Sequence, residues 1–177
     1  LSENLFEGLA PWLQKLPGGL IHVNVVGCAL FAAISGSSAA TVATVGKMSI
    51  PELRKRKYPE KILLGSLAGS GTLGLLIPPS IILIIYGVTV QESIAKLFIA
   101  GIIPGIMIAL IFMGYVIVWS LLNKNKMPTN FENFSFLNKL GKSKQLIPVI
   151  LLILGVIGSI YTGIATATEA ASLGVVG

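Results

Sequence analysis

The chain has 177 residues, of which 54% are hydrophobic and 11% are charged. A soluble domain carries about 25% charged residues, so the composition excludes an ordinary soluble protein and predicts an all-α, multi-pass membrane protein. The formal net charge is +6, and a single cysteine, Cys28, excludes an internal disulfide. Because the chain lacks an initial Met and stops inside an apolar segment, we expect it to be part of a longer polypeptide.

Residues 1–15 carry hydrophobic side chains at spacings of three and four, including Leu5, Leu9 and Trp12. This periodicity predicts an amphipathic helix that lies in the membrane interface, with Trp12 at the level of the lipid headgroups. The element ends at Pro17, Gly18 and Gly19.

Residues 16–46 form an apolar run interrupted by three serines and a glycine, Ser35-Gly36-Ser37-Ser38. One interpretation is a re-entrant hairpin whose polar tip belongs to a binding site, because non-helical backbone at membrane depth is tolerated only beside protein or water. The other is a single long helix whose serines bond back to carbonyls one turn earlier.

Residues 47–61 include the basic run Arg54-Lys55-Arg56-Lys57. A short basic loop between apolar segments predicts a cytoplasmic location. Since membrane flanks account for this charge, we expect no nucleic-acid partner, and an anionic-lipid patch is the weaker alternative.

Residues 62–91 contain no charge, and Pro78 and Pro79 interrupt them. Two prolines remove two amide donors, so the sequence predicts a discontinuous transmembrane helix. Carbonyls freed near such a break resemble the ion sites of transporters, and a plain proline kink is the alternative. Small residues before the break, among them Gly65 and Gly69, are expected to pack the broken helix against the hairpin.

Three further elements complete the chain. The sequence predicts a transmembrane helix over residues 97–123, a second basic cytoplasmic loop with a short helix over residues 124–144, and a transmembrane segment over residues 145–177. The last segment contains Glu169, which is either an intramembrane functional acid or a residue at the outer interface.

Several motifs occur in an order and spacing typical of one protein family. They are Gly18-Gly19-Leu20, Ser35-Gly36-Ser37-Ser38-Ala39-Ala40, Ile50-Pro51-Glu52, Leu73-Gly74-Leu75-Leu76-Ile77-Pro78-Pro79-Ser80, Leu97-Phe98-Ile99-Ala100-Gly101, Pro104-Gly105 and Thr166-Ala167-Thr168-Glu169-Ala170-Ala171. With these motifs the chain resembles the large membrane subunit of tripartite ATP-independent periplasmic (TRAP) transporters over nearly its whole length.

The resemblance implies a sodium-coupled (Na+) importer of a carboxylate-bearing solute, such as a C4-dicarboxylate or sialic acid, in the bacterial inner membrane. It implies two partners, a small TRAP membrane subunit and a periplasmic solute-binding protein. The implied fold has inverted repeats, each with a re-entrant hairpin and a discontinuous helix, and an elevator-type motion. The chain would supply the first hairpin and broken helix, the next helix and, in residues 145–177, the start of the second repeat.

When the functional positions of the family are carried over to this sequence, the resemblance implies a sodium site and one side of a substrate site. The sodium candidates are Ser35, Gly36, Ser37, Gly74, Ile77 and Pro78. The substrate candidates are Ser37, Ser38, Thr41, Pro79 and Ser80, and further candidates are Thr166, Thr168 and Glu169. The chain departs from many members at Thr41, where they have an acid, and at Ala167, where they have a proline.

Two other classes of function are compatible with parts of the sequence. Another ion-coupled permease or a channel subunit would share the apolar segments. An intramembrane serine protease would use Ser35 or Ser37 with His22 as its base, but the sequence offers no orienting acid. We therefore expect a transporter subunit and no enzyme.

Overall fold

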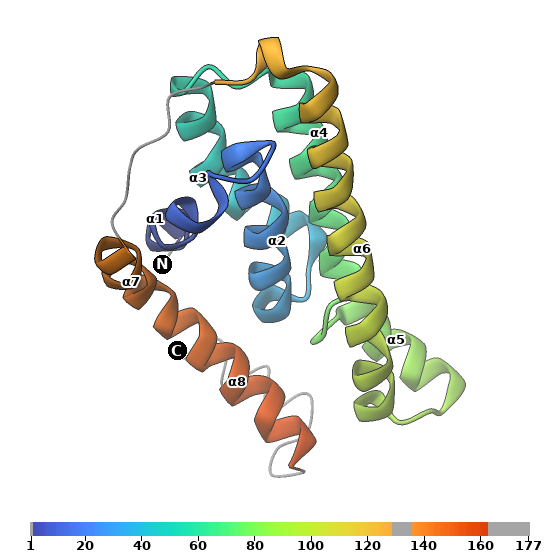
Figure 1. Ribbon diagram of the computed structural model, residues 1–177. Helices are drawn as coiled ribbons and strands as arrows, with labels where there is room; N and C mark the ends of the chain where they lie inside the picture. The colour runs from blue at the N-terminus through green and yellow to red at the C-terminus, as the bar shows by residue number, and fades with distance from the viewer. Residues whose placement is uncertain (1, 129–135, 163–177) are drawn as a thin grey trace.

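The computed structural model describes residues 2–128 and 136–162, and every regular element in these residues is helical (Figure 1). The α-helices are α1 (Ser2–Leu13), α2 (His22–Ser35), α3 (Ser38–Lys55), α4 (Glu60–Gly71), α5 (Ile81–Val90), α6 (Ile94–Leu122), α7 (Phe136–Ser143) and α8 (Ile147–Tyr161). Short 3-10 helices cover Gly19–Ile21, Thr72–Leu75, Lys124–Lys126 and Lys144–Leu146.

The core is formed where α2, α3 and α4 pack together. α2 and α3 are antiparallel arms of a helical hairpin, and α4 contacts both of them (Figure 1). Small residues bring the helices close: a Cβ on Gly46 of α3 would lie 2.9 Å from a Leu67 methyl group of α4. Apolar side chains such as Val23, Val45 and Leu63 are fully buried between the three helices. This packing fixes the position of the hairpin turn relative to α4.

The returning arm of the hairpin is longer than its apolar sequence suggests. The loop expected over residues 47–61 is helical as far as Lys55, and α4 begins at Glu60. Arg54 and Lys55 occupy the last turn of α3, where positive charge interacts favourably with the helix dipole. The basic run therefore ends a helix, and the non-helical link is shorter than expected.

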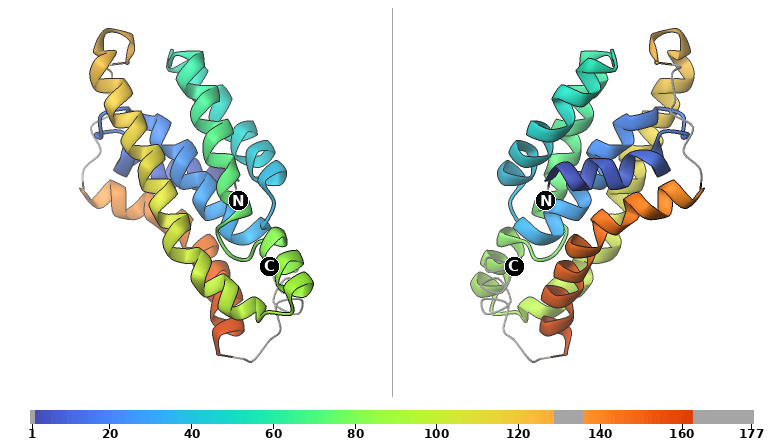
Figure 2. Two further views of the ribbon diagram at one scale, coloured as in Figure 1. Left: turned by 90° about the vertical axis from the view of Figure 1, so that its right-hand side faces the viewer. Right: turned by 90° about the vertical axis from the view of Figure 1, so that its left-hand side faces the viewer.

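α6 is the longest helix and runs beside both α4 and α5 (Figures 1 and 2). Its 29 residues correspond to about 43 Å at 1.5 Å per residue, more than the roughly 30 Å of hydrocarbon in a bilayer. In the part of the chain that the structure describes, two segments, Ile94–Leu122 and Gly141–Ser159, are long and apolar enough to cross a membrane. Large apolar side chains on α6, among them Ile103, Leu110 and Leu122, are exposed.

α1 and α7 lie side by side, and Figure 2 shows α1 running across the direction of α6. The Trp12 indole N–H donates a 2.8 Å hydrogen bond to the Ser143 hydroxyl, and the Lys139 ammonium lies 5.5 Å from the Trp12 ring centroid. Leu5, Phe6 and Leu9 are buried against the hairpin, whereas Glu7 and Trp12 are exposed. α1 thus has one apolar and one polar face, as expected for an interfacial helix.

Candidate substrate and cation site

The turn that joins the hairpin arms consists of Gly36 and Ser37. Gly36 closes α2 in the left-handed region, with φ 60° and ψ 9°, and its N–H bonds to the carbonyl of Ala32. Left-handed backbone favours glycine, which has no Cβ to clash. Ser37 is extended and caps α3, its Oγ accepting the amide of Ala40 at 3.4 Å. Residues 22–55 are therefore two helices and not one continuous helix.

Three oxygens cluster inside this turn. The Ser35 and Thr41 hydroxyls lie 3.1 Å apart. Both also point to the carbonyl of Ser37, with Thr41 Oγ1 at 2.7 Å and Ser35 Oγ at 3.3 Å. Thr41 is fully buried, so these hydrogen bonds satisfy groups that would otherwise be costly to bury.

The chain between α4 and α5 is broken at the two prolines. A 3-10 turn, Thr72–Leu75, ends α4, and the next helix starts at Ile81. The Pro78–Pro79 peptide bond is cis. The fully buried Ser80 donates its hydroxyl to the carbonyl of Leu75 at 2.6 Å, which spans the break with a side-chain bond.

The hairpin turn and the break are in direct contact. The amide of Ile81 donates to the carbonyl of Gly36 at 3.4 Å. A Cβ on Gly36 would lie 2.4 Å from the Pro79 carbonyl oxygen, and one on Gly74 would lie 2.8 Å from the Ser38 amide nitrogen. Both glycines therefore permit a backbone approach that any side chain would block.

The predicted site residues divide into two groups. Ser35, Gly36, Ser37, Ser38 and Thr41 lie in or next to the turn, and Gly74 and Pro79 contact the turn from the break. Ile77 and Pro78 lie toward α6 instead. A Cβ on Gly105 would be 2.9 Å from Ile77 Cγ1, and one on Gly101 would be 3.6 Å from Pro78 Cγ. The side chains of Ile77 and Pro78 thus pack toward α6 and not toward the hairpin turn.

Helix ends of both polarities meet at this contact. The C-terminal end of α2 lies beside the N-terminal ends of α3 and α5, and Gly74 brings the 3-10 turn after α4 against Ser37 and Ser38. Helix C-terminal ends carry partial negative charge and N-terminal ends partial positive charge. The site therefore offers electrostatic stabilisation to a cation and to an anion at neighbouring positions.

The donor set at the turn fits a hard monovalent cation. Among residues 2–128 and 136–162, no group of three or more His, Cys, Asp or Glu residues is placed to hold a metal ion. The turn instead gathers the hydroxyls of Ser35 and Thr41 around the Ser37 carbonyl, and such neutral oxygens line the Na+ sites of transporters with broken helices. Cation binding would require both hydroxyls to turn their hydrogens away from that carbonyl.

A buried polar network below the turn was missed at the sequence level. Asn24 is fully buried in α2, and its Nδ2 donates to the Leu63 carbonyl at 3.1 Å and to Ser66 Oγ at 3.0 Å. Ser70 donates its hydroxyl to the Asn24 carbonyl at 3.4 Å. A lone amide in an apolar run, opposite serines spaced four apart on α4, is the signal that could have revealed this network.

The glycine pair at positions 65 and 69 does not pack against the hairpin. A Cβ on Gly65 would meet nothing within 4 Å, and one on Gly69 would meet Phe112 of α6 at 3.3 Å. The expectation that the small residues of α4 pack against the hairpin is therefore wrong for Gly65 and Gly69 and confirmed for other members of the set. Ser66, Ser70 and Gly71 occupy that face, since Asn24 bonds to both serines and a Cβ on Gly71 would overlap Val42.

The remaining candidates lie elsewhere. Thr166, Thr168 and Glu169 are outside the residues that the structure describes. His22 and Ser35 occupy opposite ends of α2, about 20 Å apart at 1.5 Å per residue. The Nε2 of His22 is 2.8 Å from the Pro17 carbonyl. This separation leaves Ser35 without the histidine base that a serine protease needs.

A helix broken at two prolines, a polar hairpin turn against that break and apolar segments long enough to cross a membrane are together typical of α-helical membrane transporters. Comparison with known families specifies the class. The chain belongs to the family described as the tripartite ATP-independent periplasmic transporter, DctM component, whose model matches residues 1–177.

Curated relatives agree with this assignment. The chain is 40% identical over 176 residues to the C4-dicarboxylate TRAP transporter large permease protein DctM of Pseudomonas aeruginosa, covering 99% of this chain and 40% of that protein. It is 38% identical over 172 residues to the sialic acid TRAP transporter permease protein SiaT of Haemophilus influenzae, covering 97% and 27%. It is 36% identical over 176 residues to the ectoine/5-hydroxyectoine permease UehC of Ruegeria pomeroyi, covering 97% and 39%. The chain thus spans two-fifths or less of these relatives.

Proposed function

We propose that this chain forms the first half-site of a TRAP large permease subunit that couples Na+ entry to the import of a small organic acid. In this proposal the turn of the hairpin binds Na+ and, with the broken helix, one side of the substrate. The site then moves across the bacterial inner membrane by an elevator-type motion. The proposal rests above all on the contact between the hairpin turn and the proline break.

The oxygens at the turn support the cation part of the proposal. Ser35 Oγ, Thr41 Oγ1 and the Ser37 carbonyl form a compact group within 3.3 Å of one another. Hydroxyl and carbonyl oxygens can replace the hydration shell of Na+ without placing a fixed negative charge in the membrane. Gly74 would add backbone from the break, because it lies against Ser37 and Ser38.

The helix N-termini support the organic-acid part. α3 begins at Ser38 and α5 at Ile81, and the two starts adjoin through the Gly36–Ile81 hydrogen bond. Such ends bind carboxylates with their free amides and partial positive charge, and a neighbouring bound Na+ would add to this attraction. Ser38, Thr41, Pro79 and Ser80 are the proposed substrate-side residues. The names of the relatives include C4-dicarboxylates, sialic acid and ectoine, so the substrate here is proposed only as a carboxylate-bearing solute.

The family also supports two partners. We propose that a small TRAP membrane subunit and a periplasmic solute-binding protein complete the transporter, with the latter delivering the solute. The basic ends of α3 and α7 would then face the cytoplasm under the positive-inside rule. A cysteine introduced at Lys57 should react with an impermeant maleimide only after the cells are opened, and labelling of intact cells would contradict this orientation.

The central experiment measures Na+-dependent uptake by the intact permease with its partner proteins. Ser35→Ala and Ser37→Ala should each reduce uptake at low Na+ while expression is unchanged. Ser35→Ala removes a hydroxyl of the proposed cation group, whereas Ser37→Ala keeps the Ser37 carbonyl but removes the hydroxyl that caps α3 at Ala40 and so loosens the turn. The matched control is Ser159→Ala on α8, whose hydroxyl bonds only to its own helix at Val156, and it should behave as wild type. Normal Na+ dependence of uptake in both turn variants would contradict the assignment of the turn as a Na+ site.

Replacing the two prolines tests the other half of the contact. The double variant Pro78→Ala, Pro79→Ala restores two amide donors and allows α4 and α5 to join into one helix. Uptake should be abolished, while the permease still reaches the membrane. Full activity would show that the break is dispensable.

A further inference from the structure

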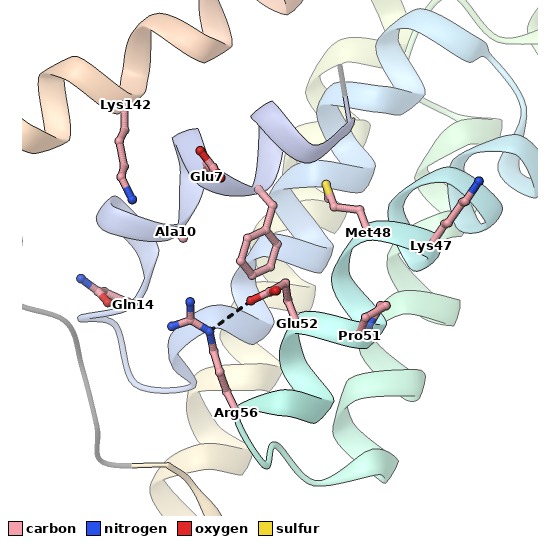
Figure 3. A pocket seen from close by; sticks show the side chains of 10 residues that line it. Glu7, Ala10, Gln14, Lys47, Met48, Pro51, Glu52, Arg56 and Lys142 are labelled. Atoms are coloured by element: carbon pink, nitrogen blue, oxygen red, sulfur yellow. Dashed lines mark ion pairs between the residues drawn. The ribbon is translucent and has the colours of Figure 1, made fainter.

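A mixed-charge pocket lies between α1, α3 and α7, away from the hairpin turn. It has a volume of about 420 Å³, within the usual range for small-molecule sites. Figure 3 shows that α1 forms one wall, the last turns of α3 another, and Lys142 of α7 a third. The site described above uses none of its lining residues.

The lining combines charges of both signs. Its basic residues are Lys47, Arg56 and Lys142, and its acidic residues are Glu7 and Glu52. Arg56 Nε lies 3.6 Å from a Glu52 carboxylate oxygen, and both side chains remain partly exposed, at 33% and 39%. In Figure 3 Arg56 extends from the end of α3 toward α1, and Lys142 points down toward the same region from α7.

The pocket also has an apolar side. Phe6, Ala10, Met48 and Pro51 line it together with the charged groups. α1 presents Trp12 at 44% exposure next to α7, as a helix at the level of the headgroups does. A ligand that fits must therefore combine a charged group with an apolar body.

We propose that this pocket binds the headgroup of a zwitterionic phospholipid with a primary amine, namely phosphatidylethanolamine. The guanidinium of Arg56 and the ammonium of Lys142 bind the phosphate, because charge-assisted hydrogen bonds to phosphate are among the stronger ones. Glu7 and Glu52 accept hydrogen bonds from the lipid ammonium. The apolar side, including Phe6 and Met48, contacts the glycerol and the start of the acyl chains.

The charge pattern favours this lipid over others. Glu52 lies beside Arg56, and Glu7 accepts a 3.1 Å hydrogen bond from Gln145 Nε2. A purely anionic headgroup would gain from the three cations but would offer no positive charge to these two carboxylates. Phosphatidylcholine has the same phosphate, but its trimethylammonium group has no N–H to donate to Glu7 or Glu52. The two acids are thus expected to determine selectivity, and Arg56 and Lys142 to determine affinity.

The test uses the intact permease, purified in a non-ionic detergent, and measures lipid affinity by calorimetric titration. The titrants are dioctanoyl-phosphatidylethanolamine, dioctanoyl-phosphatidylcholine and water-soluble O-phosphoethanolamine. Arg56→Gln should weaken phosphatidylethanolamine binding about tenfold, as expected for losing one charge-assisted hydrogen bond. The matched control is Arg54→Gln, which removes a charge from the same run but pairs with Glu60 and does not line the pocket; it should bind like wild type.

Two further variants keep the test decisive. If Arg56→Gln does not fold, Lys142→Gln on α7 should give the same direction of loss. The double variant Glu7→Gln, Glu52→Gln should remove the preference for phosphatidylethanolamine over phosphatidylcholine while retaining binding to both. Equal effects of the Arg54 and Arg56 substitutions would overturn the proposal, as would an absence of headgroup preference in the wild type. Binding of O-phosphoethanolamine as tight as that of the lipid would overturn it in favour of a soluble phosphoester site.

Discussion

The amide of Ile81, the first residue of α5, donates a hydrogen bond to the carbonyl of Gly36, the residue that caps the C-terminal end of α2. The bond joins two segments that are 45 positions apart, since 81 minus 36 is 45. Because this bond uses backbone atoms alone, its geometry depends on how closely the two segments approach each other. Small residues control that distance. The predictions below begin with that approach.

Substituting Gly36 should separate the turn from the break. In Gly36→Ala the Cβ would lie 2.4 Å from the Pro79 carbonyl oxygen on a residue with φ 60°, so both overlap and backbone strain oppose the native contact. We expect a loss of about 2–4 kcal/mol in the free energy of unfolding and loss of uptake. Thermal unfolding of the purified permease measures the first effect. The control Gly65→Ala meets nothing within 4 Å and should be as stable as wild type or slightly more so.

Substituting Thr41 should change the sodium dependence. Thr41→Val keeps the shape but removes the hydroxyl that bonds to the Ser37 carbonyl at 2.7 Å. If this oxygen binds Na+, the half-saturating Na+ concentration for uptake should rise about tenfold. Thr41→Ser retains the hydroxyl and should restore most of the affinity. An unchanged Na+ titration in Thr41→Val would exclude this hydroxyl as a ligand.

Asn24 should contribute to the stability of the hairpin on α4. Asn24→Ala removes the amide that donates to the Leu63 carbonyl and to the Ser66 hydroxyl. Because the Ser66 hydroxyl still donates to the Leu63 carbonyl, the expected cost is that of two lost hydrogen bonds, about 1–3 kcal/mol in total. Asn24→Asp should destabilise more, because it places an acceptor against the Leu63 carbonyl. Unfolding temperatures in detergent provide the measurement. Asn125→Ala, at an exposed position after α6, is the control, and a loss as large as that of Asn24→Ala would contradict the prediction.

Tyr58, in the link between α3 and α4, should make stability depend on pH above neutrality. Its hydroxyl accepts the Leu20 amide at 3.0 Å. Burial raises the pKa of this phenol, and the Leu20 hydrogen bond and Arg56 partly offset the rise. A raised pKa in the folded state means that the contribution is fully present below the unfolded value of about 10 and is lost as pH rises through the folded pKa. Tyr58→Phe should therefore be less stable at pH 8 and should lose less stability between pH 8 and pH 11.

The sequence was most informative where a residue type allows one backbone geometry. Pro78 and Pro79 predict a break because they supply no amide donors, and the helix is interrupted there. The serine-glycine motif left open either a hairpin or a single long helix. The left-handed backbone of Gly36 shows that the chain turns there. Both features are local, so they could be inferred without knowing the packing.

Other features depend on packing and were beyond sequence reasoning. The end of α3 was placed too early because Pro51 and the basic run suggest a loop, whereas the helix continues to Lys55. The small residues of α4 form more than one face, and only contact with α2 distinguishes Ser66 and Ser70 from Gly65. The pocket at α1 and α7 joins residues more than 130 positions apart, since 142 minus 7 is 135. The periodicity of a single segment does not predict a contact between residues so far apart in the sequence.

The unequal lengths of the hairpin arms have a mechanical consequence. α3 is four residues longer than α2, 18 against 14, so its basic end projects about 6 Å further at 1.5 Å per residue. Each lysine or arginine drawn to the centre of a bilayer costs about 2.5–3.5 kcal/mol, and four of them follow one another here. In the proposed elevator-type motion, this end of the hairpin would therefore resist being drawn into the hydrocarbon and would limit how far the element can travel.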